Sequence, residues 1–372
     1  MPRLNTSEAK AGPTVEFVVS IPIDLMNAMY FTHLVTEADG IEGWPVEVRK
    51  QMAPDLLQEL DFLYSFPKGQ PGVMGQLADS LWAHPETWES VDALVDYVRN
   101  MPLGVGDTAT NSGVQGLAFY VTCNPLSESE QPDVGLDPRA ALRKELEKAE
   151  EPVGQLLAVY DKPEELRDRI VRLIERFYEE HYREEIPNRL PCLERSAAEN
   201  RSRPVEDIAE LAAQITGRPR SCLFDVCEGP YATYYFSPSL DVAPYNSCSV
   251  LGDIHGLIYP CEARFIQGTA DADETARMAR VYKALSDEGR LRIISLLRER
   301  EMYAQEIVDR IGLHQSVVSR HLNFLKAVGI LRGRRENNMK FYSINTDMRE
   351  ELSQTLELFA PMAQPSPKGD AP

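Results

Sequence analysis

The chain has 372 residues, 43% of them hydrophobic, which is enough to form the cores of two or three domains. No run approaches the ~18 apolar residues of a membrane span, and residues 1–13 lack the apolar core of a signal peptide, so we expect a cytoplasmic protein without membrane contact. Six cysteines are too few for a disulfide framework. A net charge of −19 argues against a protein whose whole surface attracts nucleic acid.

The N-terminal part of the chain, residues 14–219, is predicted to be a mainly helical domain, preceded by a disordered tail at residues 1–13. A short strand is expected near residues 15–22, and apolar residues then follow the spacing of helices. The clearest helix spans residues 164–186, with an apolar stripe on one face and a proline at each end.

The aromatic residues of this domain allow two interpretations. Core packing is their usual role in a helical domain, and a ligand pocket is the alternative. The set comprises Trp44, Phe62, Tyr64, Trp82 and Trp88. Residues 1–265 contain no Gly-rich phosphate loop, nucleophile elbow or catalytic-triad spacing, so neither an enzyme activity nor a cofactor is predicted.

Residues 220–265 differ from the helical part. Runs of β-branched and aromatic residues alternate with Gly, Pro, Ser and Asn, which predicts two or three antiparallel strands. Four cysteines fall in this segment, namely Cys222, Cys227, Cys248 and Cys261. Their spacing matches no known ligand pattern, so buried thiols are the preferred interpretation and a zinc site is the alternative.

Regular patterns continue through residues 271–346. One apolar helical stripe is followed by the helix-start signal Ser286-Asp287-Glu288 and a second stripe. A short helix then ends at Gly312, which permits a tight turn, and a further helix spans residues 314–328. Two alternating runs come next, and they predict a pair of strands. This order predicts a winged helix-turn-helix with residues 314–328 as the recognition helix.

Polar residues occupy the positions between the apolar anchors of this recognition helix. They are short or forked donors and acceptors suited to base edges and phosphates: Gln315, Ser316, Ser319, Arg320 and Asn323. His321 allows two interpretations, on the DNA backbone or beneath the helix. The basic residues of the wing are expected to reach the backbone or the minor groove, and these are Arg334, Arg335 and Lys340.

Positive charge is concentrated in this segment. Residues 275–346 contain fourteen Lys and Arg residues against seven Asp and Glu residues, so an acidic body is joined to a basic module with one face for double-stranded DNA. The predicted fold class is mainly α with small β: a helical N-terminal domain with a short antiparallel β region, followed by a C-terminal winged helix-turn-helix. A helix at residues 347–360 and a disordered tail at residues 361–372 complete the prediction.

The basic segment resembles the ArsR-type winged-helix regulators over about seventy residues without a gap. The matching stretches are ALSDEGRLRIISLL, IGLHQSVVSRHLNFLKAVGIL and RRENNMKFYSI. The resemblance implies that Gln315, Ser316, Ser319 and Arg320 touch bases. It also implies a homodimer formed through the helices that flank the winged core, including residues 347–360. The region before the module is similar to that of long ArsR-type proteins with an N-terminal domain of unknown function.

The chain departs from the family pattern at two places. His314 stands where the family usually has a capping Ser or Thr, so a shifted or weakened helix cap is expected. Residues 301–307 lack the Cys-x-Cys site of the family's metal sensors, and no cysteine follows Cys261. We therefore expect no metal sensing by the winged-helix module.

Together these patterns predict a dimeric, sequence-specific DNA-binding transcription regulator that is expected to be a repressor. An unknown small-molecule or protein effector is expected to act through the N-terminal domain, with its site within residues 1–265. Two alternatives from other classes stay open: an enzyme fused to a DNA-binding module, and a scaffold that recruits a protein partner to DNA.

Overall fold

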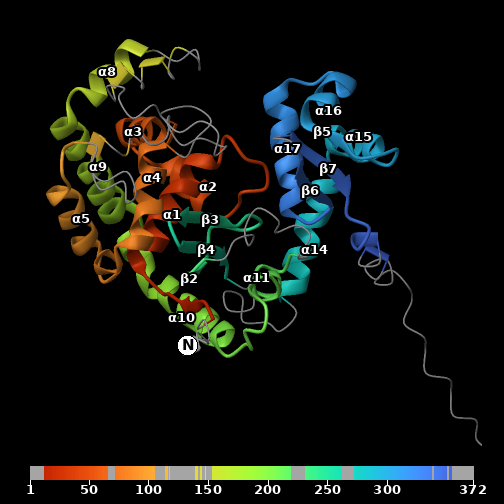
Figure 1. Ribbon diagram of the computed structural model, residues 1–372, viewed down its shortest axis with the longest axis horizontal. Helices are drawn as coiled ribbons and strands as arrows, with labels where there is room; N and C mark the ends of the chain where they lie inside the picture. Colours follow the sequence, from red (N-terminus) through yellow and green to blue (C-terminus); the bar gives the residue numbers. More distant parts are fainter. Residues whose placement is uncertain are drawn as a thin grey trace, which may run out of the picture.

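The computed structural model describes residues 12–65, 72–104, 114, 115, 117, 139, 140, 143, 144, 147, 153–218, 231–261, 272–336, 339–349, 352 and 353. The two expected tails lie almost entirely outside this set, as does most of the helix expected at residues 347–360. Figure 1 shows helices arranged around a small sheet, with the C-terminal elements in blue on one side. No helix among the described residues is long and apolar enough to cross a membrane.

Short helices form the larger part of the N-terminal domain. Their apolar faces meet in one core, and they are α1 (Ile21–Leu34), α2 (Trp44–Gln51), α3 (Pro54–Ser65), α4 (Gly72–Ser80), α5 (Val91–Asn100), α8 (Val153–Tyr160) and α9 (Pro163–Phe177). Two 3-10 turns, η1 (Leu81–Ala83) and η2 (Pro85–Trp88), lie between α4 and α5. Helix α1 begins at Ser20, whose Oγ accepts a hydrogen bond from the Ile23 amide at 3.3 Å. Because α1 is buried on nearly all sides, its polar side chains also point into the interior.

The helix predicted at residues 164–186 begins at Pro163 as expected but does not end at Pro187. It continues through a π-helical turn, a 3-10 turn and a further helix: η3 (Tyr178–Tyr182), η4 (Arg183–Glu185) and α10 (Ile186–Arg201). Helix α11 (Ile208–Thr216) begins separately after a short non-helical stretch, with Asp207 as its cap. A proline lacks an amide hydrogen but fits the first turn of a helix, so Pro187 begins α10 instead of ending α9.

The strands form one four-stranded sheet with the order β1-β2-β4-β3. They are β1 (Thr14–Phe17), β2 (Thr233–Ser239), β3 (Ser247–Leu251) and β4 (Ile254–Pro260). Strands β1 and β4 run parallel to β2, and only the β3–β4 pair is antiparallel. Three strands lie within residues 220–265, as predicted, and β3 and β4 are antiparallel, but β2 runs parallel to β4 and pairs with β1 from outside the segment. Apolar alternation identifies strands but not the direction or origin of their partners. Phe17, Phe236 and Tyr259 share one core with residues of α10 and α11, so the sheet belongs to the N-terminal domain.

A buried ionic cluster joins the helices to the sheet. Arg189 of α10 places Nη1 3.0 Å from Asp24 Oδ2 on α1 and 2.7 Å from Asp241 Oδ2 after β2. The rings of Trp44 and Tyr182 lie 4.3 and 4.9 Å from its guanidinium. The three ionic side chains are at most 4% exposed, and this burial raises the pKa of Asp241 despite the neighbouring arginine. The cluster fixes α1, α10 and the end of β2 relative to one another.

The C-terminal part has the topology of a winged helix-turn-helix, as predicted. Its elements are α14 (Ala272–Leu285), α15 (Glu288–Leu297), β5 (Met302–Tyr303), α16 (Ala304–Ile311), α17 (Gln315–Ala327), β6 (Leu331–Glu336) and β7 (Met339–Ile344). The strands form an antiparallel sheet with the order β5-β7-β6. Gly312 ends α16 with φ +72°, a left-handed conformation that glycine adopts without strain. Helix α17 lies within the predicted recognition helix.

Candidate DNA-binding site

Helix α17 begins with an unusual cap. The His314 Nδ1 accepts a hydrogen bond from the Ser316 amide at 3.3 Å and lies 2.8 Å from the Ser316 Oγ. A side-chain acceptor at this position satisfies an amide that the helix leaves unpaired, which is the role of Ser or Thr in other helices. The expected shift or weakening of the cap is therefore wrong, because the imidazole replaces the hydroxyl.

The predicted base-contacting residues lie on the face of α17 that the core does not use. Gln315, Ser316, Ser319 and Asn323 are exposed, and Arg320 is half-buried. The Arg320 Nε is shielded from solvent without a hydrogen-bond partner among the described residues. An unpaired buried donor costs about 1–3 kcal/mol, so this guanidinium gains free energy when it reaches an acceptor outside.

Arg334 lies on the wing strand β6, where two carboxylates already bind its guanidinium. Its Nε donates to Glu301 Oε2 at 2.9 Å, and its Nη1 donates to Glu336 Oε2. These hydrogen bonds raise the pKa of Arg334 above its ordinary value. A DNA phosphate must therefore compete with both acids for this arginine.

The other two predicted wing residues differ in what the structure shows. The Lys340 side chain is half-buried, with Nζ 5.9 Å from the centre of the Tyr342 ring. The backbone of Arg335 belongs to β6, and its side chain lies outside the described residues. Phosphate contact by these two residues stays a prediction.

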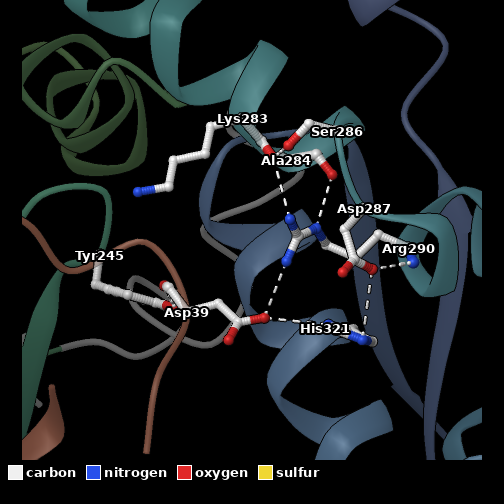
Figure 2. A network of polar contacts seen from close by, with 8 residues as sticks. All are labelled: Asp39, Tyr245, Lys283, Ala284, Ser286, Asp287, Arg290 and His321. Atoms are coloured by element: carbon white, nitrogen blue, oxygen red, sulfur yellow. Dashed lines mark hydrogen bonds and ion pairs between the residues drawn. The ribbon is translucent and has the colours of Figure 1, made fainter. Parts of the chain in front are cut away.

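His321 lies at a contact between the winged helix and the N-terminal domain (Figure 2). Its Nδ1 is 3.1 Å from Asp39 Oδ2, its Nε2 is 3.6 Å from Asp287 Oδ1, and the residue is 8% exposed. Asp39 belongs to the loop between α1 and α2, and its backbone carbonyl accepts a hydrogen bond from the Tyr245 hydroxyl at 2.5 Å. In this conformation the His321 imidazole contacts Asp39 and Asp287, and a contact of His321 with the DNA backbone stays a prediction.

The same Asp39 carboxylate also binds Arg290 of α15. The Arg290 Nη1 donates to Asp39 Oδ2 at 3.0 Å, while Nε and Nη2 donate to the Ala284 and Lys283 carbonyls at 2.7 and 3.0 Å. Those carbonyls end α14, so Arg290 closes that helix and links it to the N-terminal domain (Figure 2). Because Arg290 is rigidly held, Asp39 meets a preformed cation.

Two further contacts lie on either side of Asp39. Gly40 packs against the ring of Phe324 on α17, and a Cβ at this position would collide with that ring. Gly40 also has φ +83°, which glycine adopts most readily. Glu42 forms an ion pair with Lys283 at the end of α14. The loop from Asp39 to Glu42 therefore matches the winged helix in both shape and charge.

The polar face of α17 and the N-terminal domain enclose a cleft of about 770 Å³. The winged-helix wall consists of Ser319, Arg320, Asn323, Lys326, Ala327 and Lys340. Tyr30, Glu37, Tyr64 and Tyr245 belong to the opposite wall. A recognition helix must enter a groove about 12 Å wide that is flanked by two phosphate backbones, and a cleft of this size has no room for them. In this conformation the N-terminal domain occupies the DNA side of the recognition helix.

The cysteines of the predicted β segment do not converge where the structure describes them. Cys248 is exposed on β3, whereas Cys261 is buried after β4 and its Sγ donates to the Cys192 carbonyl at 3.5 Å. Cys222 and Cys227 lie outside the described residues. Among the described residues, no three His, Cys, Asp or Glu side chains are grouped as a metal site requires.

Sequence reasoning missed the residues of the interdomain contact. Asp39 and Gly40 form an Asp-Gly pair, which signals a turn but not its partner. Asp39 and His321 are 282 positions apart in the chain. The excess of Asp and Glu over Lys and Arg in the N-terminal part was the one sequence feature that indicated a contact with the basic winged-helix module.

The fold and the exposed polar face of α17 define a winged helix-turn-helix DNA-binding transcription regulator, and comparison with known proteins agrees. Residues 287–332 match the family model described as "Bacterial regulatory protein, arsR family". An uncharacterized HTH-type transcriptional regulator of Methanocaldococcus jannaschii is 38% identical over 77 residues, which cover 20% of this chain and 86% of that protein. The transcriptional repressor SdpR of Bacillus subtilis is 32% identical over 74 residues, covering 20% of this chain and 82% of SdpR. The chain belongs to the ArsR family.

Another similar protein also matches a minor part of the chain. The transcriptional activator HlyU of Vibrio cholerae is 32% identical over 72 residues, covering 19% of this chain and 67% of that protein. Its solved structure matches with 28% identity and a TM-score of 0.20, covering 24% of this chain and 97% of the HlyU chain. These matches cover about a fifth to a quarter of the chain.

Proposed function

We propose that the arrangement described above is a closed state of this regulator, and that an open state binds operator DNA as a homodimer. The observation that carries the proposal is the cleft in which Ser319, Arg320 and Asn323 face the N-terminal domain. The N-terminal domain covers the recognition helix in the closed state and responds to an effector by releasing it. Repression is the proposed mode, on the likeness to the repressor SdpR.

Residues on the recognition helix and the wing are proposed to contribute differently to DNA binding. An operator is first selected from random duplexes, and two half-sites about one helical turn apart are expected in it. Arg320→Ala is expected to weaken operator binding by about 1–3 kcal/mol and to reduce the ratio of specific to non-specific affinity. Lys340→Ala is expected to weaken binding to all sequences and to lower the salt slope by about one. If Arg320→Ala leaves the ratio of specific to non-specific affinity unchanged, Arg320 contacts a phosphate and not a base.

Substitution of Asp39 tests whether the contact between the two domains limits DNA binding. Asp39→Ala removes the contacts with Arg290 and His321, and about 1.4 kcal/mol lost from the closed state corresponds to about tenfold tighter operator binding. Fluorescence anisotropy with the full chain measures the affinity.

The control for this variant is Asp168→Ala, which removes an exposed carboxylate on α9 and is expected to leave the affinity unchanged. Gly40→Ala separates the same surfaces by collision with Phe324 and is expected to act in the same direction as Asp39→Ala. Unchanged operator affinity in both interface variants, with intact circular dichroism, rules out occlusion as the means of control.

A further inference from the structure

A cavity of about 220 Å³ lies inside the N-terminal domain, between α1, α4 and β3. Its walls are mostly apolar and aromatic, and they include Met26, Tyr30, Tyr64, Leu81, Trp82 and Ile258. The Trp82 ring is fixed by stacking on Tyr235, with ring centres 5.9 Å apart. The volume corresponds to about seven water molecules, so it admits a molecule of roughly seven to ten non-hydrogen atoms.

One carboxylate lines this cavity. Asp79 of α4 is partly accessible through the cavity, and its Oδ1 accepts a hydrogen bond from the Ser249 hydroxyl. Desolvation raises the pKa of Asp79 to about 6. None of the described residues that line the cavity is Lys, Arg or His. A cation that enters the cavity therefore meets the Asp79 carboxylate, which no described lining residue of opposite charge neutralises.

The other polar groups of the cavity also favour a ligand that donates hydrogen bonds. The Asn27 Nδ2 donates to the Ser239 hydroxyl at 2.7 Å, so this amide offers its carbonyl oxygen to a ligand. Burial and the nearby Asp79 raise the pKa of Tyr30 to about 12, which keeps its ring a neutral phenol. The faces of tyrosine and tryptophan rings attract cations. The cavity thus combines hydrogen-bond acceptors, aromatic faces and one negative charge.

We propose that this cavity is the effector site and that it binds a small primary amine with an aromatic body. The ammonium group would donate to Asp79, and the ring would pack against Trp82. A carboxylate ligand would meet like charge at Asp79, and a neutral ligand would leave that charge uncompensated. A quaternary ammonium has no N–H group to donate. An arylalkylamine satisfies the charge, the hydrogen bonds and the volume together.

The same site has a direct route to the recognition helix. Tyr30 and Tyr64 line both this cavity and the cleft in front of α17, and their ring centres are 5.6 Å apart. A ligand that pushes these rings toward the cleft disfavours the closed state. This coupling rests on the proposed function, whereas binding of the amine does not.

Binding is tested by isothermal titration calorimetry of the full chain with 2-phenylethylamine, its neutral analogue 2-phenylethanol and the anion 3-phenylpropionate. The amine is expected to bind at least tenfold tighter than the alcohol, and the anion is expected not to bind. Asp79→Asn should abolish this preference, while Asp168→Asn should keep it. Ala78→Leu fills the cavity without changing charge and should weaken binding of the amine and the alcohol alike. No saturable amine binding, or a preference that survives in Asp79→Asn, overturns the site.

Coupling is tested by operator affinity with and without 2-phenylethylamine. The amine is expected to raise the affinity several-fold in the wild type and to have a smaller effect in Asp39→Ala, whose closed state is already weakened. Amine binding without any change in operator affinity overturns the effector role while the site stands. The affinity of Asp39→Ala without amine tests the closed state independently, so the two proposals fail in different measurements.

Discussion

Replacement of Arg189 by methionine is expected to lower the free energy of unfolding of the N-terminal domain by about 3–5 kcal/mol. The substitution leaves Asp24 and Asp241 buried beside each other without their shared cation. Methionine preserves most of the volume between Trp44 and Tyr182, so the loss reports the missing charge rather than a cavity. Chemical denaturation followed by circular dichroism measures the difference.

The control for this prediction is Arg183→Met, which removes an arginine that pairs with Glu179 at the surface. An exposed pair of this kind is worth about 0–1 kcal/mol, so little change is expected. The deficit of Arg189→Met should also grow as the pH rises from about 4. Burial raises the pKa of Asp241 and Arg189 opposes that rise, so ionisation of this carboxyl costs the folded variant more free energy than the folded wild type. A deficit no larger than that of Arg183→Met would show that the cluster does not hold the domain together.

Asp79→Asn is expected to change stability in the opposite direction, by about 2–3 kcal/mol at pH 8. Desolvation raises the pKa of Asp79 from 3.8 to about 6, and each pKa unit corresponds to about 1.4 kcal/mol. Below about pH 4 the carboxyl is protonated in the folded and unfolded states alike, so the variant has no advantage there. The wild type loses stability as the pH rises from 4 to 6, and above 6 the difference is constant.

Denaturation curves at pH 4 and pH 8 check this difference, with Asp168→Asn as the exposed control. Equal stability of Asp79→Asn and the wild type at pH 8 would contradict a desolvated carboxylate in the cavity. The prediction also separates binding from folding. A variant that is more stable than the wild type and yet fails to distinguish an amine from an alcohol has lost a ligand contact, not its structure.

The winged helix could be predicted from the sequence because its determinants are local. The apolar spacing around Val318 and Leu322, the glycine at position 312 and the alternating wing strands all lie within a few residues of the contacts they make. The cap of α17 was the exception. Statistical preference for Ser or Thr did not anticipate that the imidazole of His314 accepts the same hydrogen bond.

The sheet, the cleft in front of α17 and the cavity of the N-terminal domain could not be predicted, because each depends on contacts between residues far apart in the sequence. Nothing near Thr233 indicates that β1 will pair with it from the N-terminus. Tyr64 and Trp82 were recognised as possible lining residues, but Asp79 looked like any acid on a helix until its burial was known. Similarly, the pairing of Asp39 with His321 requires the arrangement of two domains.

The acidic loop in front of α17 also has a consequence for how DNA binding responds to ions in solution. A basic module releases counterions from a duplex when it binds, and this release makes affinity fall steeply with salt. In the proposed opening of the full chain, the ion pairs of Asp39 and Glu42 break before DNA binds, and the freed carboxylates then attract cations of their own. Fewer ions are therefore released overall, and added salt weakens the closed state as well as the DNA complex. The regulator would keep a more even affinity for its operator as the salt content of its surroundings changes.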